Sequence, residues 1–221
     1  MGIWQFLETY GFVITQGTVV TVAQFILAAM VAIVVAVIAG LGKLSRNALI
    51  QSASVAFIEL FRGTSLLVQL YWIFFVLPLF GISLDKFTAG FLSVGLNYGA
   101  YGAEIVRGAI QSVARGQWEA AIAINMTPLT RMRRIIAPQA LAIMLPPWGN
   151  LMIELLKGTA LVSLISVTDL MFQAKQINAS TYLSAQAFGT ALLIYYVLAR
   201  LLITPLMGLM ERVVGRRLGR S

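Results

Sequence analysis

Charged side chains inside long apolar stretches are the residues of this chain best suited to act on a ligand. Glu154 and Lys157 lie three residues apart in one such stretch, and Glu59 and Arg62 have the same spacing in another. Residues at this spacing share a helix face, so each pair is expected to form an ion pair. Charges within a membrane are costly unless they are paired or face a cavity. For Glu154 and Lys157 two roles stay open: a structural pair, or a place on a transport path where either charge meets a zwitterionic solute.

Four further polar side chains are candidates for the same substrate path: Asn150, Thr64, Gln69 and Glu104. The asparagine lies one turn before Glu154 and is expected to share its helix face. For the threonine and the glutamine, hydrogen-bonded packing between helices is the alternative role. The Glu104 carboxylate ends an apolar stretch beside Arg107, and its alternative role is an extension of both side chains to the inner membrane surface.

The residue types that catalysis uses most are missing from the chain. Its 221 residues include no histidine and no cysteine, which removes the commonest general base and metal ligand and all thiol chemistry. No paired carboxylates or nucleophile arrangement supports a membrane-embedded enzyme. The phosphate-binding motif G-x-x-x-x-G-K-[ST] is absent, since Gly40 to Lys43 has the wrong spacing. We therefore expect no catalysis, no metal and no cofactor on this chain.

Composition indicates the class of protein. Hydrophobic residues make up 59% of the chain and charged residues only 11%, whereas soluble domains carry about 25% charged residues. The mean hydropathy of +0.87 agrees with an all-α integral membrane protein. The net charge of +8 could indicate a nucleic-acid partner, but the distribution of the charges argues against one.

Five apolar stretches are long enough to cross a bilayer as helices, since about 20 apolar residues span its hydrocarbon core. They cover residues 17–41, 49–78, 89–106, 139–166, with an interruption at Pro146-Pro147, and 183–210. Residues 1–16 are predicted to be an outer-face interfacial segment, 17–210 the transmembrane domain and 211–221 a basic cytoplasmic tail. The polar segment 167–182 is predicted to be an outer loop that includes a short helix.

The basic residues predict the orientation of these spans. Loops assigned to the inside carry eleven of the sixteen basic residues, and loops assigned to the outside carry two, Lys86 and Lys175. Inner loops of membrane proteins are enriched in lysine and arginine, so we expect the N-terminus outside and the C-terminus inside. Gly95 and Gly99 in the third stretch have G-x-x-x-G spacing, which suits packing within the chain or a seam with another subunit.

The polar segment 115–138 between the third and fourth spans is predicted to be a cytoplasmic helix-turn-helix. Gln117 to Ile124 is a good helix former, and Asn125 follows where a left-handed C-cap is expected. Thr127-Pro128 then provides an N-cap and a proline at the first helical position. Ala137-Pro138 is expected to kink the chain into the fourth span. A hairpin that lies on the membrane without a partner is the alternative.

This segment resembles the EAA loop of ABC importer permeases. The resemblance rests on Glu119-Ala120-Ala121, on Asn125 at the usual glycine position and on Ala137-Pro138 at the usual Leu-Pro. Three further blocks, Phe61–Leu70, Ala103–Gly108 and Leu156–Ser163, resemble the polar amino acid permease family in order and spacing. Within that family, residues 61–70 with Ser65, together with residues 121–125, are most similar to ectoine/hydroxyectoine permease subunits.

The resemblance implies a transport subunit of the bacterial inner membrane with no chemistry of its own. It assigns Glu119, Ala120, Ala121, Asn125 and Pro138 to coupling with an ABC ATPase dimer on separate chains. It also implies a second permease subunit, as a heterodimer first and a homodimer second, and a periplasmic or lipid-anchored solute-binding protein. The solute would be a polar amino acid or a derivative such as ectoine. Membrane lipids are expected partners and nucleic acid is not; an ATP-independent channel or exporter scaffold is the alternative.

Overall fold

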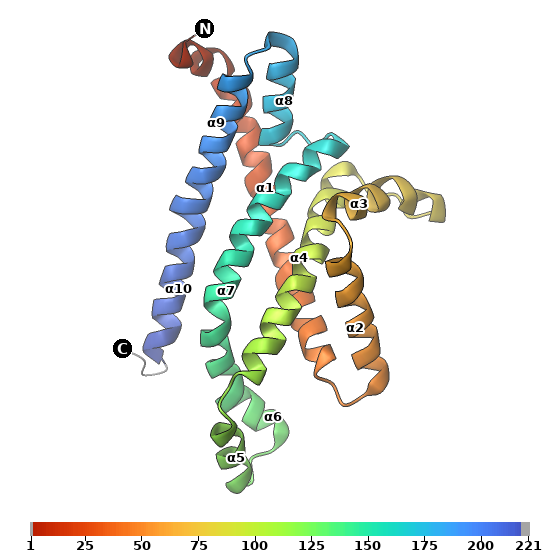
Figure 1. Cartoon of the computed structure of the whole chain (residues 1–221), viewed down its shortest axis with the longest axis vertical. Coiled ribbons are helices and arrows are strands. Elements are labelled where there is room, and N and C mark those ends of the chain that lie inside the picture. Colours follow the sequence, from red (N-terminus) through yellow and green to blue (C-terminus); the bar gives the residue numbers. More distant parts are fainter. Residues whose placement is uncertain (1, 218–221) are drawn as a thin grey trace.

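The computed structural model describes residues 2–217, and every regular element among them is helical (Figure 1). The α-helices are α1 (Ile3–Lys43), α2 (Ala48–Gly63), α3 (Leu66–Tyr71), α4 (Lys86–Gln111), α5 (Arg115–Ala123), α6 (Pro128–Arg131), α7 (Ala137–Gly158), α8 (Leu170–Thr181), α9 (Ser184–Val197) and α10 (Thr204–Arg217). Wider π-helical turns cover Trp72–Val76, Met132–Ile136 and Leu198–Ile203, and 3-10 turns cover Leu77–Phe80 and Thr159–Ile165. The predicted all-helical class is confirmed.

Among residues 2–217, three helical segments are long and apolar enough to cross a membrane: Ile3–Lys43, Pro128–Ile165 and Ser184–Gly215. The bent pair of α2 with Leu66–Phe80 makes a fourth if it counts as one span. The predicted third span corresponds to α4, which lies between the other long helices and is not among these candidates (Figure 1). The membrane class is thus supported, and the number of five spans stays a prediction.

Helix α1 is longer than the apolar stretch 17–41 that predicted it. It runs without a break through Gly17, so residues 3–16 belong to the same helix as the predicted first span. Its 41 residues give a length of about 60 Å, roughly twice the hydrocarbon thickness of a bilayer. The first turns of α1 therefore reach well past the part of the helix that a membrane would cover.

The second predicted span is not one straight helix. Between Gly63 and Leu66 the chain bends by 106°. Thr64 and Ser65 have extended backbone conformations, and Ser65 is the N-cap of α3. The Thr64 hydroxyl donates to the carbonyl oxygen of Leu60 at 2.7 Å, which terminates α2. Residues 49–78 therefore form a bent pair of helices, because local hydrogen bonding at Thr64 and Ser65 competes with the helix. That this pair makes one span stays a prediction.

The fourth predicted span is continuous, contrary to the expected interruption. Pro146 and Pro147 both lie inside α7. Each proline removes one backbone donor, and transmembrane helices tolerate this where neighbouring helices surround them. At the other end, the π-helical turn Met132–Ile136 comes directly before Ala137-Pro138. Because the ring of Pro138 would crowd the carbonyl group four residues earlier, the wider turn accommodates it and the helix continues.

The centre of the molecule is the contact between α1 and α4. Cβ atoms added at Gly95 and Gly99 would lie 2.6 Å and 2.7 Å from the Cβ atoms of Val31 and Val35 on α1. Both glycines are buried, and Ala32 packs between these contacts. Of the two readings of the G-x-x-x-G spacing, packing within the chain is therefore confirmed.

The two ends of the molecule carry different loops. The N-terminus and α8 lie at one end, and α5 and α6 lie at the other (Figure 1). Helix α8 confirms the short helix expected within 167–182, and buried Asp169 caps it by accepting a hydrogen bond from the Phe172 N–H at 2.9 Å. Of the predicted tail 211–221, residues 211–217 continue α10, and residues 218–221, with Arg220, lie outside the described residues.

Candidate functional sites: the helix-turn-helix and a polar pocket

The turn between α5 and α6 has the conformation that its sequence predicts. Asn125 has a left-handed backbone with φ 54°. Its N–H donates to the Ile122 carbonyl at 2.8 Å, and the Met126 N–H donates to the Ala121 carbonyl at 3.0 Å. These two bonds form a Schellman motif that ends α5. The asparagine therefore performs the backbone role that a glycine usually has at such a position.

The second helix of the loop begins as expected. Thr127 is the N-cap, and its hydroxyl oxygen accepts a hydrogen bond from the Thr130 N–H at 3.4 Å. Pro128 occupies the first helical position, where its missing N–H costs nothing. The helix-turn-helix over 115–138 is thus confirmed as a structure.

The loop is attached to the long helices through one packed face. Ala121 is 3% exposed, and Trp118 packs against the core cluster that contains Val113 and Ile136. The Gln139 side-chain amide donates to the Gln117 side chain at 3.2 Å, which adds a polar link between α5 and α7. The predicted position Pro138 lies at the start of α7, next to this contact, and is half-buried.

The opposite face of the loop is exposed. Glu119 and Ala120 are both on the surface. In the same helix-turn-helix, Ile122, Ile124 and Leu129 expose 56%, 70% and 78% of their surface. Several exposed large apolar side chains on one loop are typical of a protein contact.

A polar pocket of about 390 Å³ lies at the bend between α2 and α3. Helices α4 and α7 complete its walls, with Tyr98 and Tyr101 from the former and Glu154 from the latter. The pocket brings together two of the predicted path residues, Thr64 and Glu154, which are ninety positions apart in the sequence. Thr64 and Ser65, the two residues of the bend, both line the pocket.

A hydrogen-bond network stabilises the bend. The Gln69 side-chain amide donates to the Thr64 hydroxyl at 2.7 Å and to the Phe61 carbonyl at 2.9 Å. Asn97 on α4 donates to the Gln69 side-chain oxygen and to the Phe61 carbonyl, each at 3.0 Å. Asn97 was not among the predicted residues, although a buried amide inside an apolar stretch is a recognisable signal. Gln69 therefore stabilises the bend, and it also lines an apolar cavity of about 540 Å³ together with Thr64.

Of the two ion pairs that the sequence predicts, one forms and the other does not. Glu154 and Lys157 form the expected ion pair at 2.8 Å, and both side chains are 59% exposed. Glu59 and Arg62 form no ion pair within residues 2–217, so that expectation is wrong. The Arg62 guanidinium instead lies over the ring of Tyr101, 5.3 Å from its centroid. The aromatic ring holds this cation beside the pocket.

Two predicted path residues lie elsewhere. Asn150 is exposed on α7 and does not line the pocket. Glu104 accepts from Lys43 at 2.6 Å and from Arg107 at 2.8 Å. Its carboxylate thus joins the end of α1 to α4, and the structure does not bring it to the polar pocket.

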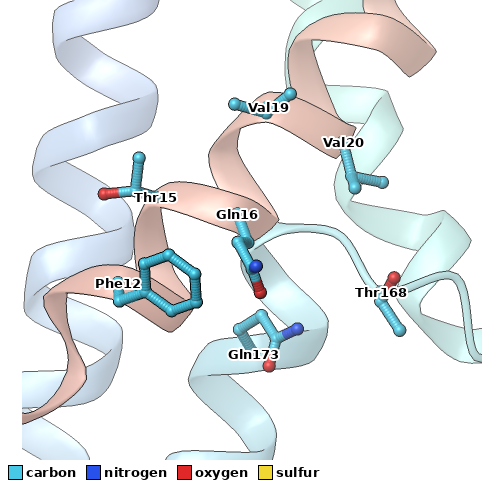
Figure 2. Close-up of a pocket in the computed structure, with 7 residues that line it drawn as sticks. All are labelled: Phe12, Thr15, Gln16, Val19, Val20, Thr168 and Gln173. Atoms are coloured by element: carbon cyan, nitrogen blue, oxygen red, sulfur yellow. The ribbon is translucent and has the colours of Figure 1, made fainter.

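A further cavity of about 410 Å³ lies near the N-terminal end of the molecule, between α1 and α8. Figure 2 shows Gln16 of α1 and Gln173 of α8 pointing toward one another, with Phe12 and Thr168 at its sides. It contains none of the predicted site residues. Amide, hydroxyl and apolar groups line this cavity, which lies at the end of the molecule opposite α5 and α6.

Comparisons with known proteins agree with these features. The family model described as binding-protein-dependent transport system inner membrane component matches residues 6–219. A protein of Sinorhizobium fredii named as a probable amino-acid ABC transporter permease is 46% identical over 183 residues, 80% of this chain and 76% of the relative. The L-cystine transport system permease protein TcyB of Bacillus subtilis is 35% identical over 94% of this chain and 87% of its own length. The solved structure of an amino acid ABC transporter with histidines contains a similar chain, with a TM-score of 0.88 and 36% identity over 96% of this chain and 98% of that chain.

Proposed function

The chain belongs to the family of binding-protein-dependent transport system inner membrane components, and we propose that it is the permease subunit of an ABC importer for a polar amino acid or an amino-acid derivative. The exposed helix-turn-helix over 115–138 carries this proposal, because it offers a protein contact at one end of a bundle of apolar helices. The names of the relatives, which include an amino-acid permease and an L-cystine permease, support the solute class.

The loop is proposed to couple the chain to an ABC ATPase dimer on separate chains. Glu119 and Ala120 are exposed and suited to contact the ATPase. Ala121 is buried, so its role is to seat α5 against the long helices. Asn125 sets the turn, and Pro138 begins the rigid helix that would carry the movement into the membrane.

The proposed topology has five spans, with the N-terminus outside and the loop 115–138 inside. The separation of the two loop sets supports it: α8 and the N-terminus lie at one end, and α5 and α6 at the other (Figure 1). The eleven basic residues of the predicted inner loops against two in the outer loops favour the same direction. The inside would then be the cytoplasm of a bacterium, and the outer cavity of Figure 2 would face a solute-binding protein.

The polar pocket is the proposed substrate path of this subunit. Its Glu154 carboxylate is half-exposed and suited to bind the ammonium group of an amino acid. The ion pair with Lys157 partly neutralises the charge of this carboxylate. Thr64 offers a hydroxyl from the opposite wall, and Gln69 positions it. Asn150 is proposed to extend the path along α7 toward a second permease subunit. Glu104, already held by two cations, is proposed to act as a structural link.

A second permease subunit is part of the proposal, because one chain of this size is too small to enclose a polar pathway. A heterodimer is the first choice and a homodimer the second. Within the solute class, ectoine or hydroxyectoine is the narrower hypothesis, and it rests on residues 61–70 and 121–125 of the sequence alone.

Reconstitution tests the proposal. The chain is co-expressed with an ABC ATPase, a second permease and a solute-binding protein from the same organism, and ATP hydrolysis is measured in liposomes. A binding protein loaded with its amino acid should raise ATP hydrolysis and drive uptake. Uptake that continues without the ATPase would instead support an ATP-independent channel or exporter. Calorimetry of the binding protein with ectoine and with amino acids decides the narrower solute question.

A further inference from the structure

An apolar groove of about 510 Å³ lies at the end of the molecule that carries α5 and α6. Five helices or turns contribute to it: the last turns of α1 and α4, the π-helical turn Met132–Ile136, the start of α7, and α10. Its floor is formed by buried side chains, among them Val106, Ile110 and Ala140. Its outer walls include Leu41 and Leu141, which are 44% and 43% exposed. The groove is therefore open to whatever surrounds the long helices.

One cation lies at the rim of this groove. Arg133, in the π-helical turn before α7, is the charged residue among the lining side chains. It is exposed and forms no ion pair or hydrogen bond with the other described residues. The next residue, Arg134, is also exposed and unpaired in the described part of the chain, but it does not line the groove. A guanidinium that has no partner among residues 2–217 therefore lines one part of this apolar groove.

The dimensions of the groove fit one membrane leaflet. From Arg133 to Met144 the lining follows eleven residues of helix, which is about 16 Å at the usual helical rise. Half of a hydrocarbon core of about 30 Å is about 15 Å. A charged group at the water boundary followed by an apolar track of this depth matches a phospholipid, with its headgroup phosphate on the guanidinium and an acyl chain along the floor.

We infer that this groove is a binding site for an anionic phospholipid of the inner leaflet. Basic residues at helix ends on the cytoplasmic side attract anionic headgroups, and the absence of an internal carboxylate partner leaves the Arg133 charge available for this contact. A bound lipid would bridge α1, α7 and α10 directly beside the helix-turn-helix. The inference rests on the proposed orientation for the choice of leaflet, and it does not depend on the identity of the transported solute.

The test uses the assembled transporter with its ATPase. It is purified from membranes that contain phosphatidylglycerol and phosphatidylethanolamine, and the lipids that remain bound are counted by native mass spectrometry. Arg133→Gln should reduce the retained phosphatidylglycerol about fivefold, since one basic residue at a charged membrane surface contributes about 1 kcal/mol. Arg134→Gln is the matched control and should retain as much as the parent protein, and Arg133→Lys should restore retention.

A second variant fills the groove without a change of charge. Leu141→Trp should also lose phosphatidylglycerol, whereas Leu192→Trp, on a 67% exposed position of α9, should not. If Arg133→Gln fails to assemble, Leu141→Trp and Arg133→Lys still decide the question. Equal retention by Arg133→Gln and Arg134→Gln, or full retention by Leu141→Trp, would overturn the inference.

A second copy of the chain and a free anion are the alternative occupants of the groove, and each predicts a different experimental result. The chain has no cysteine, so Leu141→Cys is a clean probe of contact between two copies. A disulfide-linked dimer in native membranes would mean that a second copy covers the groove, against the inference. Displacement of phosphatidylglycerol by water-soluble glycerol phosphate at equal concentration would mean that the site selects a free anion and not a lipid. Inaccessibility of α5 from the cytoplasmic side would overturn the proposed orientation instead.

Discussion

The guanidinium carbon of Arg131 lies 5.7 Å from the centroid of the Trp118 ring, so a cation–π contact joins the two short helices of the helix-turn-helix, α5 and α6. Trp118 packs in turn beside Ile136, within the turn that leads into α7. A force on the exposed tip of the loop would therefore reach the membrane helices through packed side chains.

The turn at Asn125 should tolerate glycine and resist a branched side chain. Asn125→Gly keeps the left-handed backbone accessible, whereas Asn125→Val should strain the loop by about 1–2 kcal/mol. Hydrogen exchange over 115–128 should then increase for the valine variant, and ATPase assembly should weaken. Ala123→Val, exposed at the end of α5 with a right-handed backbone, is the control. Unchanged exchange in Asn125→Val would show that the left-handed cap is unimportant.

The contact between α1 and α4 should respond to a single methyl group. Gly99→Ala places a Cβ 2.7 Å from Val35 and should destabilise the protein by about 1–3 kcal/mol. Gly108→Ala, in the same helix with open space around it, should be neutral or stabilise by up to about 1 kcal/mol. Thermal unfolding of both variants in detergent measures the difference. Equal melting temperatures would contradict the close packing described above.

The turn at Asn125 and the bend at Thr64 differ in how far the sequence predicts them. Asn125 and Thr127 act through hydrogen bonds to residues within five positions, so their roles are readable from local sequence. The side-chain amide of Asn97 bonds residues 28 and 36 positions away, and no local pattern indicates that approach. Tertiary packing also let α7 continue through Pro146, where local rules predicted an interruption.

Substitution of Glu154 should impair transport, whereas substitution of Glu104 should impair the stability of the fold. Glu154→Gln removes the proposed contact for a substrate ammonium group and should lower uptake at least about tenfold, with assembly and melting temperature nearly unchanged. Glu104→Gln leaves Lys43 and Arg107 without their carboxylate and should lower the melting temperature instead. Uptake in liposomes and thermal unfolding are measured on the same preparations. Normal uptake by Glu154→Gln would remove this residue from the substrate path.

Asp169 should make stability depend on pH. Burial raises the pKa of its carboxyl from 3.8 to about 6. At a pH between these two values the carboxyl is therefore mostly protonated in the folded state and mostly ionised in the unfolded state. Stability should therefore increase as the pH falls from about 7 to about 4, by up to about 3 kcal/mol. Asp169→Asn keeps an acceptor for the Phe172 N–H and should flatten this slope.

Asp85 is the control, because its pKa shifts in the direction opposite to that of Asp169. It caps α4, and hydrogen bonds with Thr88 lower the pKa of its carboxyl. Its contribution to stability is present above the unfolded pKa and is lost as the pH falls through the folded value. Asp85→Asn should therefore leave the slope between about pH 4 and pH 7 intact. Equal slopes in the parent protein and in Asp169→Asn would mean that the buried carboxyl does not titrate as stated.

Charge reversal at Glu119 tests the coupling role of the helix-turn-helix most directly. Glu119 is exposed and forms no hydrogen bond or ion pair with the other described residues, so Glu119→Lys should leave the melting temperature unchanged. Co-purification with the ATPase should be lost, and ATP-driven uptake with it, while Glu211→Lys on exposed α10 retains both. A Glu119→Lys protein that assembles with its ATPase and imports solute as well as the parent would contradict the proposed coupling.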